Sequence, residues 1–156
     1  MTERSTVHAT ITVERTYGAE PARVFRAWAD PALRVQWDVP GEGWETVMHA
    51  QDFRVGGRER SIFGPKGAAN IRSEGWYLDI VPERRIVSAG TMHEGDARIS
   101  STLCTVELLP EGEGARVLVT DQTAYFEGRD KPEWREGGWG TILDRLGAFL
   151  APATAH

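Results

Sequence analysis

The sequence predicts an α+β fold in which a curved antiparallel sheet of about seven strands wraps around one long C-terminal helix. Segments with strand-like alternation follow one another from the N-terminus, and short connections rich in glycine and proline join them. A single long amphipathic segment ends the chain, and no earlier segment offers it an equal partner helix. Its apolar face must therefore be covered by the sheet.

The C-terminal helix is predicted over residues 130–150. Asp130 is a candidate N-cap with Glu133 as its capping-box partner, and Pro132 suits the first turn. Four glycines within the helix suggest that another part of the chain approaches it closely or that the helix bends near Trp139. Its apolar stripe has steps of three and four residues and comprises Trp139, Ile142, Leu143, Leu146, Phe149 and Leu150. We expect this helix to form one wall of a cavity.

The N-terminal part predicts a strand followed by two short helices. Apolar and polar residues alternate from Val7 to Glu14, as in a strand buried on one face. Pro21 can occupy the first turn of a helix, and the Asp30–Pro31 step interrupts the helical spacing that follows.

The middle of the chain predicts six further strands. Short turns containing glycine or proline connect them, so an antiparallel meander is more economical than a parallel sheet. The expected strands are residues 44–55, 58–63, 70–81, 85–91, 99–109 and 115–126.

Length and composition indicate one domain, residues 1–156, with 40% apolar and 26% charged side chains. The net charge is −5 and the basic residues are scattered, which argues against nucleic-acid binding. Cys104 is the only cysteine, and the N-terminus lacks the apolar run of a signal peptide, so we expect a cytoplasmic protein. No apolar stretch approaches the roughly 20 residues of a membrane span.

Four segments resemble one known family. They are ITVERTYGAEPARVFRAWADPALRVQW (residues 11–37), DFRVGGRER (52–60), WYLDIVPERRIV (76–87) and EGGWGTILDRLGAFL (136–150). Together they resemble the helix-grip, START-like fold and, within it, the branch of the SRPBCC superfamily related to the activator of the heat-shock ATPase.

This resemblance implies a deep cavity between the sheet and the C-terminal helix, in a family whose members bind or transform apolar small molecules. The eukaryotic namesake instead binds a heat-shock chaperone. The resemblance also allows a homodimer, since START-like domains often self-associate. It implies no fixed set of catalytic residues.

Asp121 and His93 are the candidates for acid–base chemistry. Asp121 shares a strand face with Val117 and Val119. If that face lines the cavity, the apolar setting would raise the pKa of Asp121, whereas if Leu118 marks the inner face, Asp121 is solvated. His93 can carry a proton near neutral pH, although a strand-end histidine bonded to turn backbone is the commoner arrangement.

Aromatic and small residues are the candidates for the cavity lining. Each aromatic residue is more often plain core than ligand contact, but several from different elements would converge in a helix-grip fold. Ser88 and Gly90 would leave space unfilled on one face of their strand. The expected ligand-binding residues are Trp37, Trp44, Phe53, Phe63, Trp76, Ser88, Gly90, Met92, Trp139 and Leu143.

The sequence gives little support for a metal site, a hydrolase triad or a phosphate-binding loop. The four histidines and Cys104 lack metal-ligand spacing, so we expect neither a metal nor an organic cofactor. There is no G-x-S-x-G motif, and Gly56–Gly57 lacks the following residues of a phosphate loop. One charged group is typical of a solvated hairpin edge, although it also suits a partner-docking patch; it comprises Arg54, Arg58, Glu59 and Arg60, beside Arg84 and Arg85.

The leading hypothesis is a protein that binds an apolar, aromatic or lipid-like small molecule in an internal cavity. If the protein is an enzyme, this hypothesis predicts proton transfer of the cyclase or hydratase type, with Asp121 as acid or base and His93 assisting. A chaperone-interaction module is the alternative from a different class, and a stress-response protein whose ligand alters its partner choice is the third.

Overall fold

The computed structural model describes residues 5–152. The N-terminal strand β1 (Thr6–Tyr17) leads into two short helices, α1 (Pro21–Ala29) and α2 (Pro31–Arg34). The long helix α3 (Pro132–Leu150) ends the described chain. Between α2 and α3 lie β2 (Trp44–Gln51), β3 (Arg58–Pro65), β4 (Ile71–Val81), β5 (Arg85–Glu94), β6 (Ala97–Glu111) and β7 (Gly114–Phe126).

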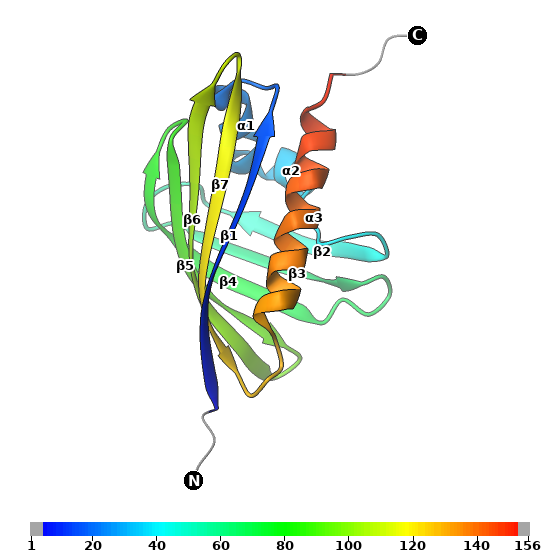
Figure 1. Ribbon diagram of the computed structural model, residues 1–156. Coiled ribbons are helices and arrows are strands. Elements are labelled where there is room, and N and C mark those ends of the chain that lie inside the picture. Colours follow the sequence, from blue (N-terminus) through cyan, green and yellow to red (C-terminus); the bar gives the residue numbers. More distant parts are fainter. Residues whose placement is uncertain (1–4, 153–156) are drawn as a thin grey trace.

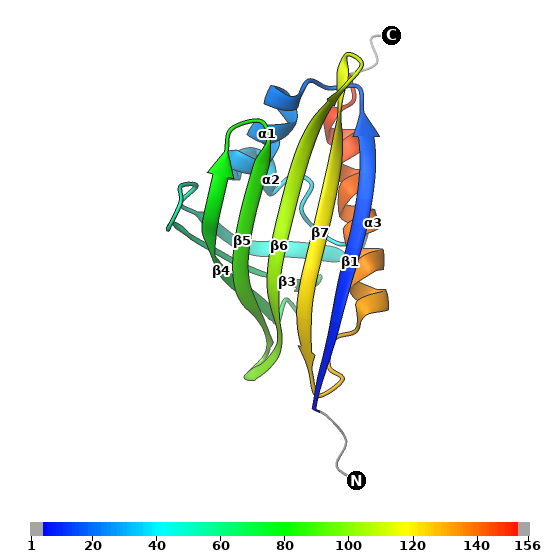
Figure 2. The same cartoon turned by 60° about the vertical axis from the view of Figure 1, so that its left-hand side comes forward.

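The strands form one seven-stranded antiparallel sheet in the order β1-β7-β6-β5-β4-β3-β2. Figures 1 and 2 show that the sheet bends around α3, so that β2 and β3 run across the direction of β5, β6 and β7. The predicted fold class, with a curved sheet on a C-terminal helix and two short helices after the first strand, is confirmed.

The apolar stripe of α3 packs against the sheet as its spacing predicts. Leu143, Leu146 and Leu150 are buried, and they belong to one core cluster with residues of β1, β6 and β7. The Tyr17 hydroxyl donates a 2.6 Å hydrogen bond to the Leu143 carbonyl oxygen. A Cβ on Gly147 would lie 3.1 Å from the Tyr17 ring, so at this glycine the chain does approach α3 closely.

The start of α3 differs from the prediction. Lys131, not Asp130, is the N-cap residue, and it makes no side-chain cap. One Asp130 oxygen accepts a hydrogen bond from the Lys131 backbone N–H, while the other accepts one from Arg135. The carboxylate that the sequence pattern assigns to the cap therefore pairs with a buried arginine instead.

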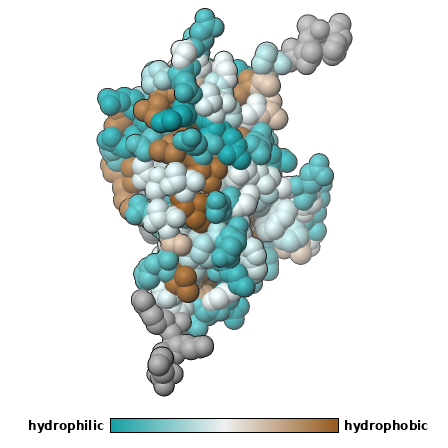
Figure 3. All heavy atoms as spheres, viewed as in Figure 1, coloured by the Kyte–Doolittle hydropathy of each residue, from teal (hydrophilic) through white to brown (hydrophobic). Residues whose placement is uncertain are grey.

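The outer surface is mixed in character. On the face shown in Figure 3, apolar side chains lie in several small groups separated by hydrophilic ones. Within residues 5–152, no helix is both long enough and apolar enough to cross a membrane.

Candidate functional site

A pocket of about 470 Å³ lies between the concave face of the sheet and α3. Its lining comes from strands β2 to β7, from the α2 region and from the N-terminal half of α3. The aromatic part of the lining comprises Trp28, Trp44, Phe63, Tyr77, Trp134 and Trp139. The pocket therefore combines apolar walls from distant parts of the sequence.

The floor of the pocket is made of small residues on neighbouring strands. Gly75 of β4 lies directly opposite Gly90 of β5 in the sheet register, and both line the pocket with Ser73 and Ser88. A Cβ on Gly90 would lie 2.0 Å from the Glu74 carbonyl oxygen. Glycine is required at Gly90 because the two backbones approach so closely.

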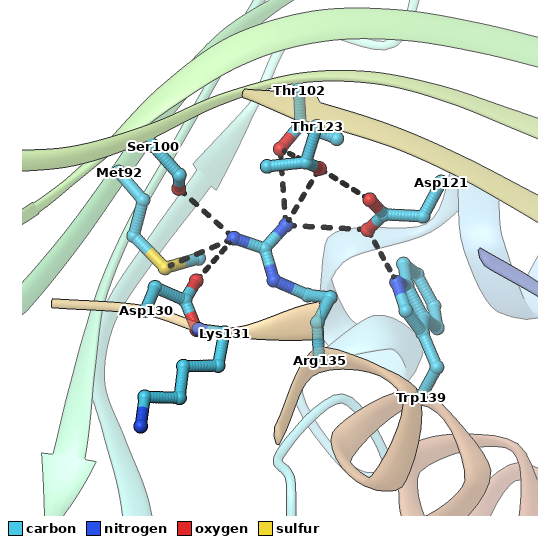
Figure 4. A network of polar contacts seen from close by, with 9 residues as sticks. All are labelled: Met92, Ser100, Thr102, Asp121, Thr123, Asp130, Lys131, Arg135 and Trp139. Atoms are coloured by element: carbon cyan, nitrogen blue, oxygen red, sulfur yellow. Dashed lines mark hydrogen bonds and ion pairs between the residues drawn. The ribbon is translucent and has the colours of Figure 1, made fainter. Parts of the chain in front are cut away.

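A buried arginine of α3 crosses to the sheet at one end of the pocket (Figure 4). Arg135 forms ion pairs with Asp130 at 2.7 Å and Asp121 at 3.2 Å. Its guanidinium also donates to the Ser100 hydroxyl at 2.9 Å and the Thr102 hydroxyl at 3.0 Å. These partners come from β6, β7 and the loop before α3, so the arginine fastens the helix to the sheet.

Asp121 lies on the inner face of β7, 1% exposed, together with the buried Val117 and Val119. This placement decides between the two faces that the sequence left open. One carboxylate oxygen accepts hydrogen bonds from Arg135 and from the Trp139 indole N–H at 2.9 Å, and the other accepts one from the Thr123 hydroxyl. Both oxygens of Asp121 are thus engaged by protein donors.

The electrostatic setting keeps Arg135 charged. Burial works against a charged guanidinium, but Asp121 and Asp130 outweigh burial and raise the pKa of Arg135. Cys104 lies across from Asp121 on β6, and burial, assisted by the Asp121 charge, raises the pKa of its thiol to about 12. The thiol is therefore neutral at ordinary pH and a poor nucleophile.

A second buried arginine lies in the α2 part of the pocket. Arg34 forms ion pairs with Asp38 and Glu59, each at 2.8 Å, and its guanidinium lies 5.9 Å from the Trp37 ring. Burial opposes the charge, but Glu59 and Asp38 together raise the pKa of Arg34. A buried ion pair joins two elements far apart in the sequence and disfavours any arrangement that leaves one charge alone.

Seven of the residues singled out by the sequence line this pocket. They include Ser88 and Gly90 of β5, and Asp121 at the Arg135 end. The seven are Trp44, Phe63, Ser88, Gly90, Met92, Asp121 and Trp139.

The structure places three others in the core. Trp37 is 1% exposed, packs edge-on against Trp28 and donates its indole N–H to the Ala27 carbonyl. Phe53 packs between Phe25 and Tyr77, and Leu143 is fully buried on the side of α3 that packs into the core. Their positions correct the expectation that they line the pocket, because neighbouring side chains enclose them first.

The last two predicted site residues, Trp76 and His93, are not part of the pocket lining. Trp76 is 45% exposed and stacks with Arg58, because the alternation of β4 turns it away from the inward-facing Tyr77. His93 lies near the end of β5, and its Nε2 is 3.4 Å from the Thr91 hydroxyl. Asp121 lines the pocket, whereas His93 does not.

Sequence reasoning missed both arginine clusters. Arg34 and Asp38 have the i,i+4 spacing of a helical ion pair, which was an available signal. Arg135 and Glu59 had none, because Asp121 and Arg34 are distant in sequence and Asp130, five residues before Arg135, does not have the spacing of a helical ion pair. Within residues 5–152, no three His, Cys, Asp or Glu side chains are grouped so that they could hold a metal ion.

The fold and the position of the pocket define a helix-grip protein of the START-like class. Residues 18–151 match the family described as activator of Hsp90 ATPase homolog 1-like protein, and the chain belongs to that family. None of the curated proteins searched matches the chain significantly.

Solved structures agree with this assignment. The Mll3558 protein from Rhizobium loti is 43% identical, with a TM-score of 0.85, over 94% of this chain and 100% of that one. A protein from Rhizobium leguminosarum is 36% identical, with a TM-score of 0.84, over 96% of this chain and 98% of that one. CalU16 from Micromonospora echinospora, 20% identical with a TM-score of 0.64, shares the fold over 96% of this chain and 88% of its own.

Proposed function

We propose that this protein binds a small molecule with an apolar or aromatic body in the pocket between the sheet and α3. The observation that carries the proposal is a space of about 470 Å³ with aromatic walls and a floor of serine and glycine. Pockets for small molecules typically measure about 300–1,000 Å³ and combine apolar walls with a few fixed polar groups. The two arginine clusters supply such fixed groups.

Binding fits the contacts of Asp121 better than proton transfer does. A general base needs a free lone pair within reach of the proton that it removes. Arg135, Trp139 and Thr123 already donate to the Asp121 carboxylate, so they occupy both oxygens and about three of its four acceptor positions. We therefore assign Asp121 to holding Arg135 and Trp139 in place, and the cyclase-type or hydratase-type version of the function is the weaker one.

The family description favours a second function, docking on a chaperone. That function would use the outer surface, where Trp76, Leu78 and Leu103 are exposed. It predicts that changes inside the pocket leave the partner interaction intact, whereas Trp76→Ala weakens it. The two functions thus respond to opposite sets of substitutions.

A thermal-shift screen of aromatic and lipid-like compounds tests the proposal. A ligand present at a hundred times its Kd stabilises the folded protein by about 2.7 kcal/mol. Ser88→Leu adds bulk to the pocket floor without removing any side-chain hydrogen bond found among the described residues. Ser101→Leu is the matched control, because Ser101 is on β6 beside Ser100 and faces away from the pocket.

The proposal expects hits that stabilise the wild type and Ser101→Leu but not Ser88→Leu. Circular dichroism should show both variants folded like the wild type. A broad library without hits, or hits that stabilise Ser88→Leu as much as the wild type, would overturn the proposal and favour the docking function.

A further inference from the structure

The two charged clusters of the pocket have the same composition. In each, one buried arginine lies between two carboxylates: Arg34 between Asp38 and Glu59, and Arg135 between Asp121 and Asp130. Each cluster therefore carries a formal net charge of −1, and the other charged residues of the lining, Glu74, Glu94 and Arg129, add a further −1. The field inside the pocket favours positive charge.

The Arg34 cluster presents its carboxylates to the pocket more than its guanidinium. The exposed fractions of the side chains are 18% for Glu59 and 24% for Asp38, against 11% for Arg34. Each carboxylate uses one oxygen for Arg34, and within residues 5–152 neither makes another hydrogen bond through its side chain. A carboxylate has about four acceptor positions, so both retain free ones.

Tyr77 provides an independent sign that a ligand group is missing from this cluster. Its side chain is 1% exposed and lines the pocket, and its hydroxyl has no hydrogen-bond partner among the described residues. The hydroxyl is close enough to Glu59 and Arg34 to interact with both, but neither contact meets the distance and angle of a full hydrogen bond. Buried hydroxyls in proteins are nearly always paired, so an unpaired one at a pocket wall points to a ligand.

We infer that the ligand carries a cationic amine on an aromatic body, and that the amine is bound at Glu59, Asp38 and Tyr77. This inference rests on the proposed function of the pocket. An ammonium group has only donors, which suit the free carboxylate oxygens and the phenol oxygen. Trp44 and Phe63, whose rings lie 6.3 Å apart in the pocket wall, offer the faces that attract cations and aromatic rings.

The same charges disfavour an anionic ligand. Of the three arginines in the lining, Arg34 and Arg135 are already paired with two carboxylates each. Arg129 is exposed to solvent, and the lining also holds Glu74 and Glu94. An anion would have to displace one of these carboxylates or remain close to like charges, which opposes binding. The pocket thus discriminates among ligands of the same shape by their charge.

The test uses three probes with one body: 2-naphthylmethylamine, 2-naphthalenemethanol and 2-naphthoate. Their Kd values are measured by isothermal titration at pH 7 for the wild type, Glu59→Gln and Asp38→Asn. Both substitutions keep the shape and remove one negative charge, and Asp38→Asn serves if Glu59→Gln does not fold. Glu14→Gln makes the same charge change on an exposed part of β1 outside the pocket.

We expect the amine to bind at least about tenfold more tightly than the alcohol, and the carboxylate to bind most weakly. Glu59→Gln or Asp38→Asn should reduce that preference at least threefold, while Glu14→Gln leaves it unchanged. Binding of the alcohol or carboxylate as tight as the amine would overturn the charge inference but keep the proposed function. Absence of binding by all three probes would count against both.

Discussion

The guanidinium of Arg135 lies 3.2 Å from the carboxylate of Asp121, and this ion pair joins the first turns of α3 to the inner face of β7. Only 13% of the Arg135 side chain and 2% of the Asp121 side chain are exposed. Trp139, one helical turn further along α3, donates to the same carboxylate. A single acidic residue of the sheet thus fixes two residues of the helix that line the pocket.

Asp121→Ala should lower the free energy of unfolding by about 3–5 kcal/mol. The substitution leaves Arg135 with one of its two carboxylates and the Trp139 indole without its acceptor, and breaking a buried ion pair has a cost of this size. Urea denaturation measures it.

Asp144→Ala is the matched control, because Asp144 pairs with Arg15 at the surface with exposed fractions of 67% and 37%. Its effect should not exceed about 1 kcal/mol. Equal losses in the two variants would show that Asp121 has no special part in holding α3.

Tyr17→Phe should destabilise the protein by about 0.5–1.5 kcal/mol, since it removes the hydrogen bond from the Tyr17 hydroxyl to the Leu143 carbonyl. Tyr125→Phe should cost almost nothing. The Tyr125 hydroxyl is also buried, but it has no hydrogen-bond partner among the described residues. Urea denaturation of both variants checks the difference, and a larger loss for Tyr125→Phe would contradict this view of how α3 is held.

The sequence was sufficient for the fold because each element has its own local signal. Alternation identifies the strands, and Asp30–Pro31 separates α1 from α2 where the structure separates them. The face of Asp121 was not decidable, because Val117, Leu118 and Val119 make both faces of β7 apolar. Its burial follows from pairing with Ile11 of β1 and Cys104 of β6, which is tertiary information.

The pocket was predictable only in part, because its charged residues find their partners through the tertiary fold. Ser88 and Gly90 signalled free space by their small size, but Arg135 and Glu59 look like solvated charges in the sequence. Glu59 lies in the charged group expected to be a hairpin edge, yet it turns inward to Arg34. The homodimer and the single domain of residues 1–156 remain predictions.

Gly90→Ala should destabilise the sheet by about 1–3 kcal/mol, because the added methyl group would lie 2.0 Å from the Glu74 carbonyl oxygen and force β4 and β5 apart. Gly137→Ala should instead stabilise the protein by up to about 1 kcal/mol. A Cβ there meets nothing within 4 Å and alanine favours the helix. Thermal unfolding should give shifts of opposite sign, and shifts of the same sign would argue against the close approach at Gly90.

Alkaline pH should destabilise the protein from about pH 9 upward. The pKa of Cys104 is raised from 9.0 to about 12 because burial favours the neutral thiol. The folded state therefore holds a proton that the unfolded state loses first, so stability is full below pH 9 and falls as the pH rises toward 12. The slope contributed by this one group is at most about 1.4 kcal/mol per pH unit.

Burial also raises the pKa values of Tyr17 and Tyr77, so these residues add to the fall above pH 10. Urea denaturation at several pH values, repeated with Cys104→Ala, isolates the thiol. The variant should lose the part of the slope that begins near pH 9. An unchanged slope would mean that Cys104 does not stay neutral in the folded protein.

A crystal structure of the protein with the tightest-binding compound from the thermal-shift screen tests the central claim most directly. The account predicts that the compound lies between the sheet and α3, with its body against Trp44, Phe63 and Trp139. A compound bound on the outer face of the sheet, or a pocket filled by the protein's own side chains, would contradict it.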